Sequence, residues 1–480
     1  MARINTNVPA LVAQTRLRRS QRDLQVSLER LSSGLRINRG ADDPAGLIAS
    51  ENLRSEIAGV TQAIDNSQRA INVIATAEGA LNEVAALLVD VQGLIVQAAN
   101  EGALSDEEIR ANQLQIDSAV ESITRIANTT SFAGRRLLDG SLNYVTSGVL
   151  PAAIDTLHVH GAQFGTQTNV PVGVVVTQSA QKAQLQFRQS AVAAAVTVEV
   201  RGNAGAVTLV FNASTTPAQI VQAVNIASDA TGVTAALINA GNPASGVVFT
   251  SAGYGAKSYV AVEALPGPGS GSFATTNTTG VADTRDEGQD AEASINGARA
   301  TGDGLDLVLN TTTLDLSLTL DEAFGIGSTN FAITAGGALF QLGPRVDTNQ
   351  QTNVGIQSVA ASRLGNGVVG FLSEIVEGGG KSLVDGKARE SSEIVNEAIR
   401  QISVLRGRLG AFEKNTLQTN INQLQITHEN LTASESVIRD TDFAAETSLL
   451  TRNQILIQAG TSVLALANST PQSVLALLGG

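Results

Sequence analysis

The chain has 480 residues, no cysteine or tryptophan, and a net charge of −13 from 31 Lys and Arg against 44 Asp and Glu. Without cysteine it cannot be a disulfide-stapled domain, a thiol enzyme or a zinc protein with cysteine ligands. Its 43% apolar content is too high for a disordered chain. Eight arginines and two acidic residues in the first 40 positions give +6 there and leave −19 for the rest.

The first 45 residues predict an amphipathic helix followed by a break. Leucines recur there at intervals of seven, four, three and four. The run from Asn38 to Ala45 is expected to end this helix, with a positive φ at Gly40, and to open the next one. Asp42 or Asp43 would cap the second helix, with Pro44 in its first turn. The leucines of the first helix are Leu17, Leu24, Leu28, Leu31 and Leu35.

Residues 45–150 contain no proline and predict long helices. Isoleucines and leucines recur every seven residues between 57 and 95, which produces an apolar seam along one helix face. Ser105 and Glu108 match a capping box and therefore predict the start of a further helix. The seam residues are Ile57, Ile64 and Ile71, then Ile74, Leu81, Leu88 and Ile95, with Val84 and Val91 between them.

The centre, roughly 145–380, is rich in Gly, Thr, Ser, Asn and Val and contains short alternating runs. Such runs bounded by glycine predict strands, so we expect one or two small β-rich insertions. One helix is expected from Thr216 to about Ala227, and a Pro-Gly linker at 266–269. The predicted strands are 196–200, 207–211, 233–238, 247–251, 259–264, 305–310, 314–320, 331–335 and 338–342.

The last 95 residues predict helices again, with two heptad series in each half of the segment. Seamed helices at both chain ends need partners, and we expect them to pair with each other. The predicted fold is therefore α+β and multidomain: a long coiled-coil bundle from both ends with a β-rich insertion. The series are Val395, Ile402 and Leu409; Leu417, Leu424, Leu431 and Ile438; and Leu449, Leu456 and Val463, beside Leu450, Ile457 and Leu464.

No pattern of residues predicts catalysis or a cofactor. His158 and His160 would share a strand face but lack a third metal ligand nearby. The run Gly302 to Asp306 is similar to one calcium-binding nonapeptide repeat, although a single copy is more typical of a turn. The basic start lacks interleaved aromatic residues for nucleic acid. It also lacks a signal-peptide apolar region, and no 18 consecutive apolar residues occur, so we expect no membrane span.

The two ends of the chain resemble bacterial flagellin. The strongest stretch is Leu31 to Ser50, which reads LSSGLRINRGADDPAGLIAS, and about half of the chain matches in the right order on both flanks. Residues 294–298 with 336–343 look like the IN-type repeat of flagellin inserts, and a looser copy covers 196–251. The other matching stretches are 66–68, 77–81, 97–100, 131–138, 408–411, 429–431, 438–442 and 457–460.

The resemblance implies a structural subunit of the extracellular flagellar filament that is not an enzyme. Residues 1–45 with 440–480 would form the inner coiled coil, 46–145 with 385–439 a helical shell, and 146–384 the variable exposed region. The unfolded chain would leave through flagellar type III export and then polymerise for swimming motility. Its partners would be other flagellin subunits, an export chaperone, and cap and hook-associated proteins, without nucleic acid or membrane insertion. The inner seam would be Leu24, Leu28, Leu31, Leu35, Leu449, Leu456 and Val463.

One departure from the family concerns recognition by the animal innate receptor. Recognised flagellins carry an arginine where this chain has Asp90, and Gln115 stands at a usual glutamate, whereas Leu94 is retained. A reversed charge at a contact weakens binding, so we expect poor recognition. Two alternative functions stay open: a hook–filament junction protein with the same ends, and an adhesin or glycan-binding module in the Thr- and Asn-rich centre.

Overall fold

The computed structural model describes residues 6–478 apart from 101, 166 and 243. The chain divides into two compact units. The first contains Met1–Ile71, Gln341–Gln350 and Glu413–Gly480, and the second contains Asn72–Phe340 and Gln351–Phe412. The boundaries of these two units differ from those of the three predicted regions, which stay a prediction.

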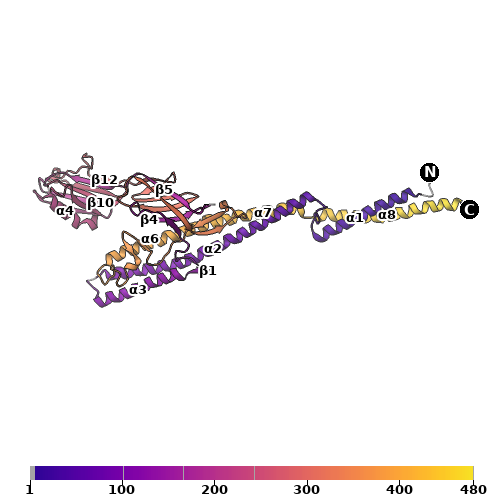
Figure 1. The fold of residues 1–480 in the computed structure, drawn as a ribbon, viewed down its shortest axis with the longest axis horizontal. Coiled ribbons are helices and arrows are strands. Elements are labelled where there is room, and N and C mark those ends of the chain that lie inside the picture. Colours follow the sequence, from indigo (N-terminus) through magenta and orange to yellow (C-terminus); the bar gives the residue numbers. More distant parts are fainter. Residues whose placement is uncertain (1–5, 101, 166, 243, 479–480) are drawn as a thin grey trace. The chain divides into compact units, whose positions relative to one another are not determined.

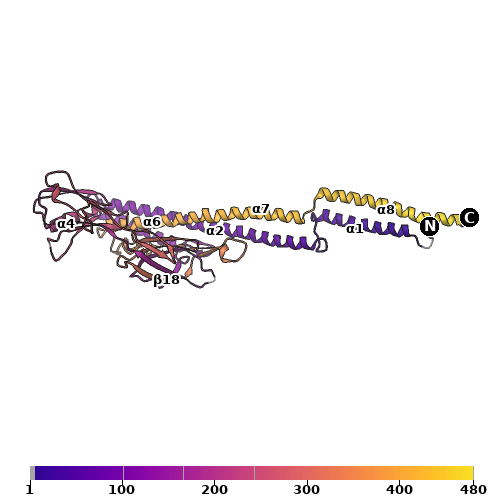
Figure 2. The ribbon, with the colours of Figure 1, turned by 90° about the horizontal axis from the view of Figure 1, so that it is seen from above.

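The first unit is helical. It contains α1 (Val8–Ser33), the first half of α2 (Pro44–Ala98), a π-helical turn (Glu413–Gln418), α7 (Thr419–Arg439) and α8 (Phe443–Leu478). Helices α1 and α8 lie side by side in both views of the ribbon (Figures 1 and 2). The segment after α1 is joined to the junction of α7 and α8 by backbone hydrogen bonds from Arg36 N–H to Arg439 O at 2.7 Å and from Thr441 N–H to Gly34 O at 3.0 Å.

The break between α1 and α2 differs in part from the prediction. Helix α1 ends at Gly34, whose φ of +75° lets its N–H reach the carbonyl of Arg30 at 2.8 Å. The expected positive φ at Gly40 is wrong, because the left-handed residue is needed directly after the last helical turn. The caps are as predicted: Asp43 Oδ1 accepts the N–H of Gly46 at 2.9 Å. Asp42 accepts backbone N–H groups in the turn, chiefly that of Arg39, which lowers the pKa of its carboxyl.

The second unit contains the rest of α2 together with α3 (Asp106–Thr129) and α6 (Ala388–Phe412). The predicted capping box forms, since Ser105 N–H donates to Glu108 Oε2 at 2.8 Å. The second predicted heptad series of α2 is buried, since Ile74, Leu81, Leu88 and Ile95 are at most 1% exposed. The first series, at 57, 64 and 71, is only half-buried. By length and composition alone α2 could also cross a membrane. Its buried seam within the protein explains the same composition, and the absence of a membrane span stays a prediction.

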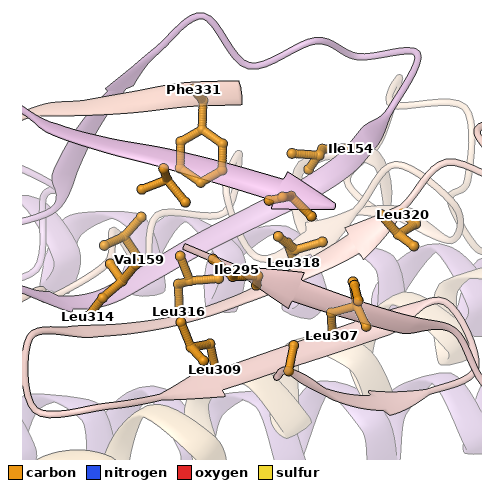
Figure 3. Packing of buried hydrophobic residues seen from close by; sticks show 14 of the residues in the cluster. Ile154, Val159, Ile295, Leu307, Leu309, Leu314, Leu316, Leu318, Leu320 and Phe331 are labelled. Carbon is orange, nitrogen blue, oxygen red and sulfur yellow. The ribbon is translucent and has the colours of Figure 1, made fainter. Parts of the chain in front are cut away.

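Two β domains complete the second unit, one inserted within the other. The first contains β3 (Tyr144–Ser147), β4 (Ile154–Ala162), β5 (Val170–Gln178), β13 (Glu292–Ile295), β14 (Ala298–Arg299), β15 (Thr301–Asp303), β16 (Asp306–Asn310), β17 (Leu314–Leu320) and β18 (Gly327–Gly336). Its strands form two antiparallel sheets, ordered β14-β13-β5-β18-β3 and β15-β16-β17-β4. Their inner faces enclose one apolar core, to which β13, β16, β17 and β18 all contribute (Figure 3).

The second β domain is inserted between β5 and β13. It contains β6 (Lys182–Phe187), β7 (Val196–Arg201), β8 (Ala206–Phe211), α4 (Pro217–Ile226), α5 (Ser228–Thr231), β9 (Val233–Leu237), β10 (Val247–Tyr254), β11 (Tyr259–Ala264) and β12 (Arg285–Glu287). The sheets are ordered β6-β10-β9 and β12-β11-β7-β8. Phe273 stacks on Phe187 in the core, with ring centroids 4.3 Å apart.

Short elements lie outside these domains. They are β1 (Ser131–Phe132), β2 (Arg135–Arg136), β19 (Ala338–Gln341), β20 (Gln351–Val354), β21 (Gly365–Asn366) and β22 (Gly370–Phe371), with 3-10 turns at Thr348–Gln350 and Leu372–Glu374. A further 3-10 turn, Ser270–Ser272, lies within the second β domain.

The α+β prediction is confirmed, and all nine predicted strands and the predicted central helix are present within two residues at most ends. Several strands were not predicted, of which the longest are those at 154–162, 170–178 and 182–187; shorter ones such as 144–147 and 292–295 were also missed. At Asn296 the φ is +51°, and the side chain accepts the N–H of Gly173 at 2.8 Å and donates to the carbonyl of Pro171 at 3.1 Å. The asparagine of the IN-type sequence thus fixes the β13–β14 turn against β5.

Neighbouring residues of α2 provide a test of the seam. Leu88→Ala should lower the free energy of unfolding of the second unit by about 2–5 kcal/mol, because it leaves a cavity at a fully buried position. Val89, 56% exposed, is the control, and Val89→Ala should change stability by less than about 0.5 kcal/mol. Urea unfolding of the monomer followed by circular dichroism measures both. Equal losses for the two variants would contradict the assigned seam.

Candidate self-assembly surface

Small and polar side chains take part in the contact between α1 and α8, together with half-buried apolar residues such as Leu17. Along α1, residues 13, 20 and 27 recur every seven residues, and along α8 residues 446, 453, 460 and 467 do the same. A Cβ added at Gly460 would lie 3.3 Å from Leu17 Cδ1, so the helices approach closely there. The buried members of these two series are Ala13, Ser27, Glu446 and Ala467.

Polar contacts fix the register of the two helices. The buried carboxylate of Glu446 lies 3.6 Å from Arg30 Nη1. At the other end, Asn7 Nδ2 donates to the carbonyl of Ala467 at 2.8 Å. Asn7 also caps α1, because its Oδ1 accepts the N–H of Ala10 at 3.1 Å. A buried charge needs its partner, so Arg30 and Glu446 specify one pairing of the helices.

The predicted seam residues are not brought together in one buried seam. Leu24, Leu31 and Leu35 are half-buried. On α8 the half-buried series is the neighbouring one, at 450, 457 and 464. The exposed ones are Leu28 at 50%, Leu449 at 42%, Leu456 at 44% and Val463 at 55%. The period of seven alone does not tell which of the two α8 series faces α1. The small residues at 13, 20 and 27 of α1 could have indicated the contact face, but they were not used in the prediction.

The exposed apolar residues of α1 and α8 together form an uncovered surface, which we name the end-helix surface. It also lines a groove between α1 and α8 that includes Val26, Leu449 and Leu456. Exposed apolar patches of this kind on soluble proteins are typical of interaction sites. The members of the end-helix surface are Val8, Leu11, Val12, Val26, Leu28, Phe443, Leu449, Ile455, Leu456, Val463 and Leu466.

Arginines accompany this surface on α1. Arg16, Arg18, Arg19 and Arg22 are all exposed. Within residues 6–478, none of the four has a carboxylate within the 4.0 Å that defines an ion pair. Arg3, the first arginine of the predicted basic arm, lies outside the described residues. Arg30, Arg36 and Arg39 of the same arm do pair with carboxylates, so the uncompensated positive charge lies at 16–22.

The positions discussed for innate recognition lie on α2 and α3. Asp90 and Gln115 are exposed, and Leu94 is half-buried. Gln92, two residues after Asp90, donates from Nε2 to Asn396 Oδ1 on α6 at 2.6 Å. These three positions belong to the second unit.

The two neighbouring histidines that the sequence singled out lie on β4. His158 and His160 share one face of β4, with ring centroids 6.5 Å apart, and no group of three potential metal ligands occurs among the described residues. Burial lowers the pKa of His160 to about 3, so its ring is neutral, with Nε2 3.0 Å from Ser317 Oγ. The run from Gly302 to Asp306 is the β15–β16 turn, as the sequence favoured.

Comparison with known proteins gives the class of this chain. The model of the bacterial flagellin N-terminal helical region matches residues 4–143, and that of the C-terminal helical region matches residues 392–478. The flagellin of Salmonella rubislaw is 32% identical over 507 aligned positions, and that of Salmonella typhimurium is 30% identical over 505. Each alignment covers 99% of both chains.

Among solved structures, FliC from Burkholderia pseudomallei is 13% identical, with a TM-score of 0.24, and the match covers 73% of this chain and 99% of that one. The family assignment rests on the sequence matches. They define a structural protein of the bacterial flagellum. The chain belongs to the bacterial flagellins, which form the extracellular flagellar filament.

The contact between α1 and α8 predicts different results for two adjacent residues. Ser27→Leu should separate the helices, because a buried small position is overpacked at a cost of about 1–3 kcal/mol. Leu28→Ser should leave the pairing intact in the monomer, since half of that side chain is already exposed. Hydrogen exchange of α1 amides measures the pairing. Unchanged protection in Ser27→Leu would contradict the assigned contact.

Proposed function

We propose that the chain is a filament subunit whose end helices complete their hydrophobic core only against neighbouring copies. The observation that carries this proposal is the end-helix surface, which α1 and α8 leave uncovered after pairing with each other. Burial of apolar surface contributes about 25 cal/mol of favourable free energy per Å², and this contribution drives such association. Leu28, Leu449, Leu456 and Val463 would lie in contacts between subunits, with Leu24, Leu31 and Leu35 beside them.

The route and partners follow from the same proposal. The chain would be exported unfolded through the flagellar type III system, with a chaperone on its C-terminal segment, and would polymerise beneath the cap after the hook-associated proteins. Its role would be swimming motility, without catalysis, nucleic-acid binding or membrane insertion. A chain without cysteine is suited to export in the unfolded state, because it cannot mispair.

A layered arrangement of the filament is part of the proposal. Residues 1–45 with 440–480 would form the inner coiled coil, and 46–145 with 385–439 the surrounding helical shell. Residues 146–384, which contain both β domains, would face the medium. The closed cores of those domains support this assignment, because they need no neighbour to bury their apolar residues.

Removing the first helix tests the assembly function. A chain lacking residues 1–35 should stay soluble and keep its β domains folded but form no filaments, because half of the end-helix surface and the partner of α8 are lost. Seeded polymerisation followed by electron microscopy measures this, and circular dichroism confirms folding. Normal filaments from the truncated chain would contradict the proposal.

Two outward residues test the surface more finely. Leu28→Ser and Leu456→Ser together should raise the critical concentration for polymerisation by at least about tenfold, since each loses roughly 1–2 kcal/mol of burial between subunits. Ser434→Ala, at an exposed position of α7, is the control and should leave it unchanged. A wild-type critical concentration in the double variant would show that this surface does not drive assembly.

We also propose that the animal innate receptor recognises this subunit poorly. Asp90 is exposed where recognised flagellins carry an arginine, so a favourable contact charge would be reversed. Asp90→Arg with Gln115→Glu should raise the response of reporter cells at a fixed monomer concentration by at least about tenfold. A strong response to the unchanged protein would contradict this prediction.

A further inference from the structure

The two β domains are connected by two short chain segments that cross between them side by side. One segment runs from the end of β5 to the start of β6, and the other from the end of β12 to the start of β13. Gln181 and Gln289 pair across these segments, with backbone N–H to carbonyl distances of 2.9 Å in both directions. Two crossing strands alone form a narrow connection, about which domains move unless another contact fixes them.

A second contact is present where a turn of each domain meets the other. The β10–β11 turn of the second domain begins at Gly255, and the β15–β16 turn of the first contains Gly304. The carboxylate of Asp290 lies between them: its Oδ1 accepts the N–H of Ala256 at 2.9 Å and that of Gly304 at 2.8 Å. One carboxylate oxygen therefore binds the backbones of both domains.

The backbones approach so closely that side chains are excluded. A Cβ added at Gly255 would lie 2.6 Å from both Cα and N of Gly304, and the φ of Gly255 is +94°. Gly304 also accepts the N–H of Ala291 at 2.9 Å. Lys257 and Asp303 form an ion pair across the same contact. This pair is exposed and contributes little, whereas the hydrogen bonds to a charged acceptor are worth more.

We infer that Asp290 is a positioning residue that clamps the two β domains into one rigid body. The turn at 302–306, whose sequence is similar to one calcium-binding repeat, is the part of the first domain that contacts the second. The inference is independent of the proposed function, because it concerns only contacts within the second unit. Without the Asp290 carboxylate, the two crossing segments would act as a hinge.

The absence of cysteine makes the inference directly measurable. Cysteines introduced at Thr208 on β8 and Ser328 on β18, both exposed, would be the only labelling sites in the full chain. Pulsed electron paramagnetic resonance on the doubly spin-labelled monomer then reports the distance distribution between the domains. We expect a narrow distribution in the chain with native Asp290, and Asp290→Ala should broaden it by roughly twofold or more.

Two controls separate clamping from general destabilisation. Asp290→Asn keeps an acceptor oxygen and should stay narrow, and so should Asp321→Ala, which removes a half-buried carboxylate that caps only a local turn. Labels at Thr208 and Thr234, both within the second domain, should be unaffected by Asp290→Ala. A narrow distribution in Asp290→Ala would overturn the inference. Equal broadening in Asp321→Ala or within the second domain would overturn it too.

Discussion

The structure depends on one constraint: every long helix of this chain has an apolar stripe that must be covered. In the second unit the chain supplies the cover itself, because the heptad residues of α2 from Ile74 to Ile95 are buried. In the first unit it does not. Helices α1 and α8 meet through small residues such as Ala13 and Gly460 and through half-buried residues such as Leu17, but many of their larger apolar residues remain exposed. The exposed apolar residues of these helices could therefore contribute further hydrophobic free energy if another copy buried them.

This difference explains the composition of the chain. Charged residues amount to only 16% and aromatic residues to 3%. A single 480-residue globule of this composition would have few charged residues for its surface and few large side chains for its core. A subunit surrounded by other subunits needs fewer charges on its end helices. The β domains follow the ordinary rule instead, because each closes its own core between two sheets (Figure 3). The uncovered apolar surface thus lies on the end helices, where the filament subunit of a flagellin would need contacts with its neighbours.

Much of the fold was predictable because it depends on local patterns. Helix caps at Asp43 and Ser105, and strands such as 314–320, follow from residue types at fixed spacings. The side of α8 that faces α1 was not predictable, since Leu449 and Leu450 begin series with the same period of seven. The strand at 154–162 was missed because its exposed and buried residues do not alternate regularly. The role of Asp290 depends on turns distant in sequence, which no local pattern identifies.

We propose that the end-helix surface is covered only when subunits assemble. Hydrogen exchange of the same protein as monomer and as filament tests it most directly, with amides of α1 and α8 compared with those of β16 and β17. The account predicts a large gain in protection in α1 and α8 on assembly and little change in the β strands, whose core is already closed. Equal protection of α1 and α8 in monomer and filament would contradict it.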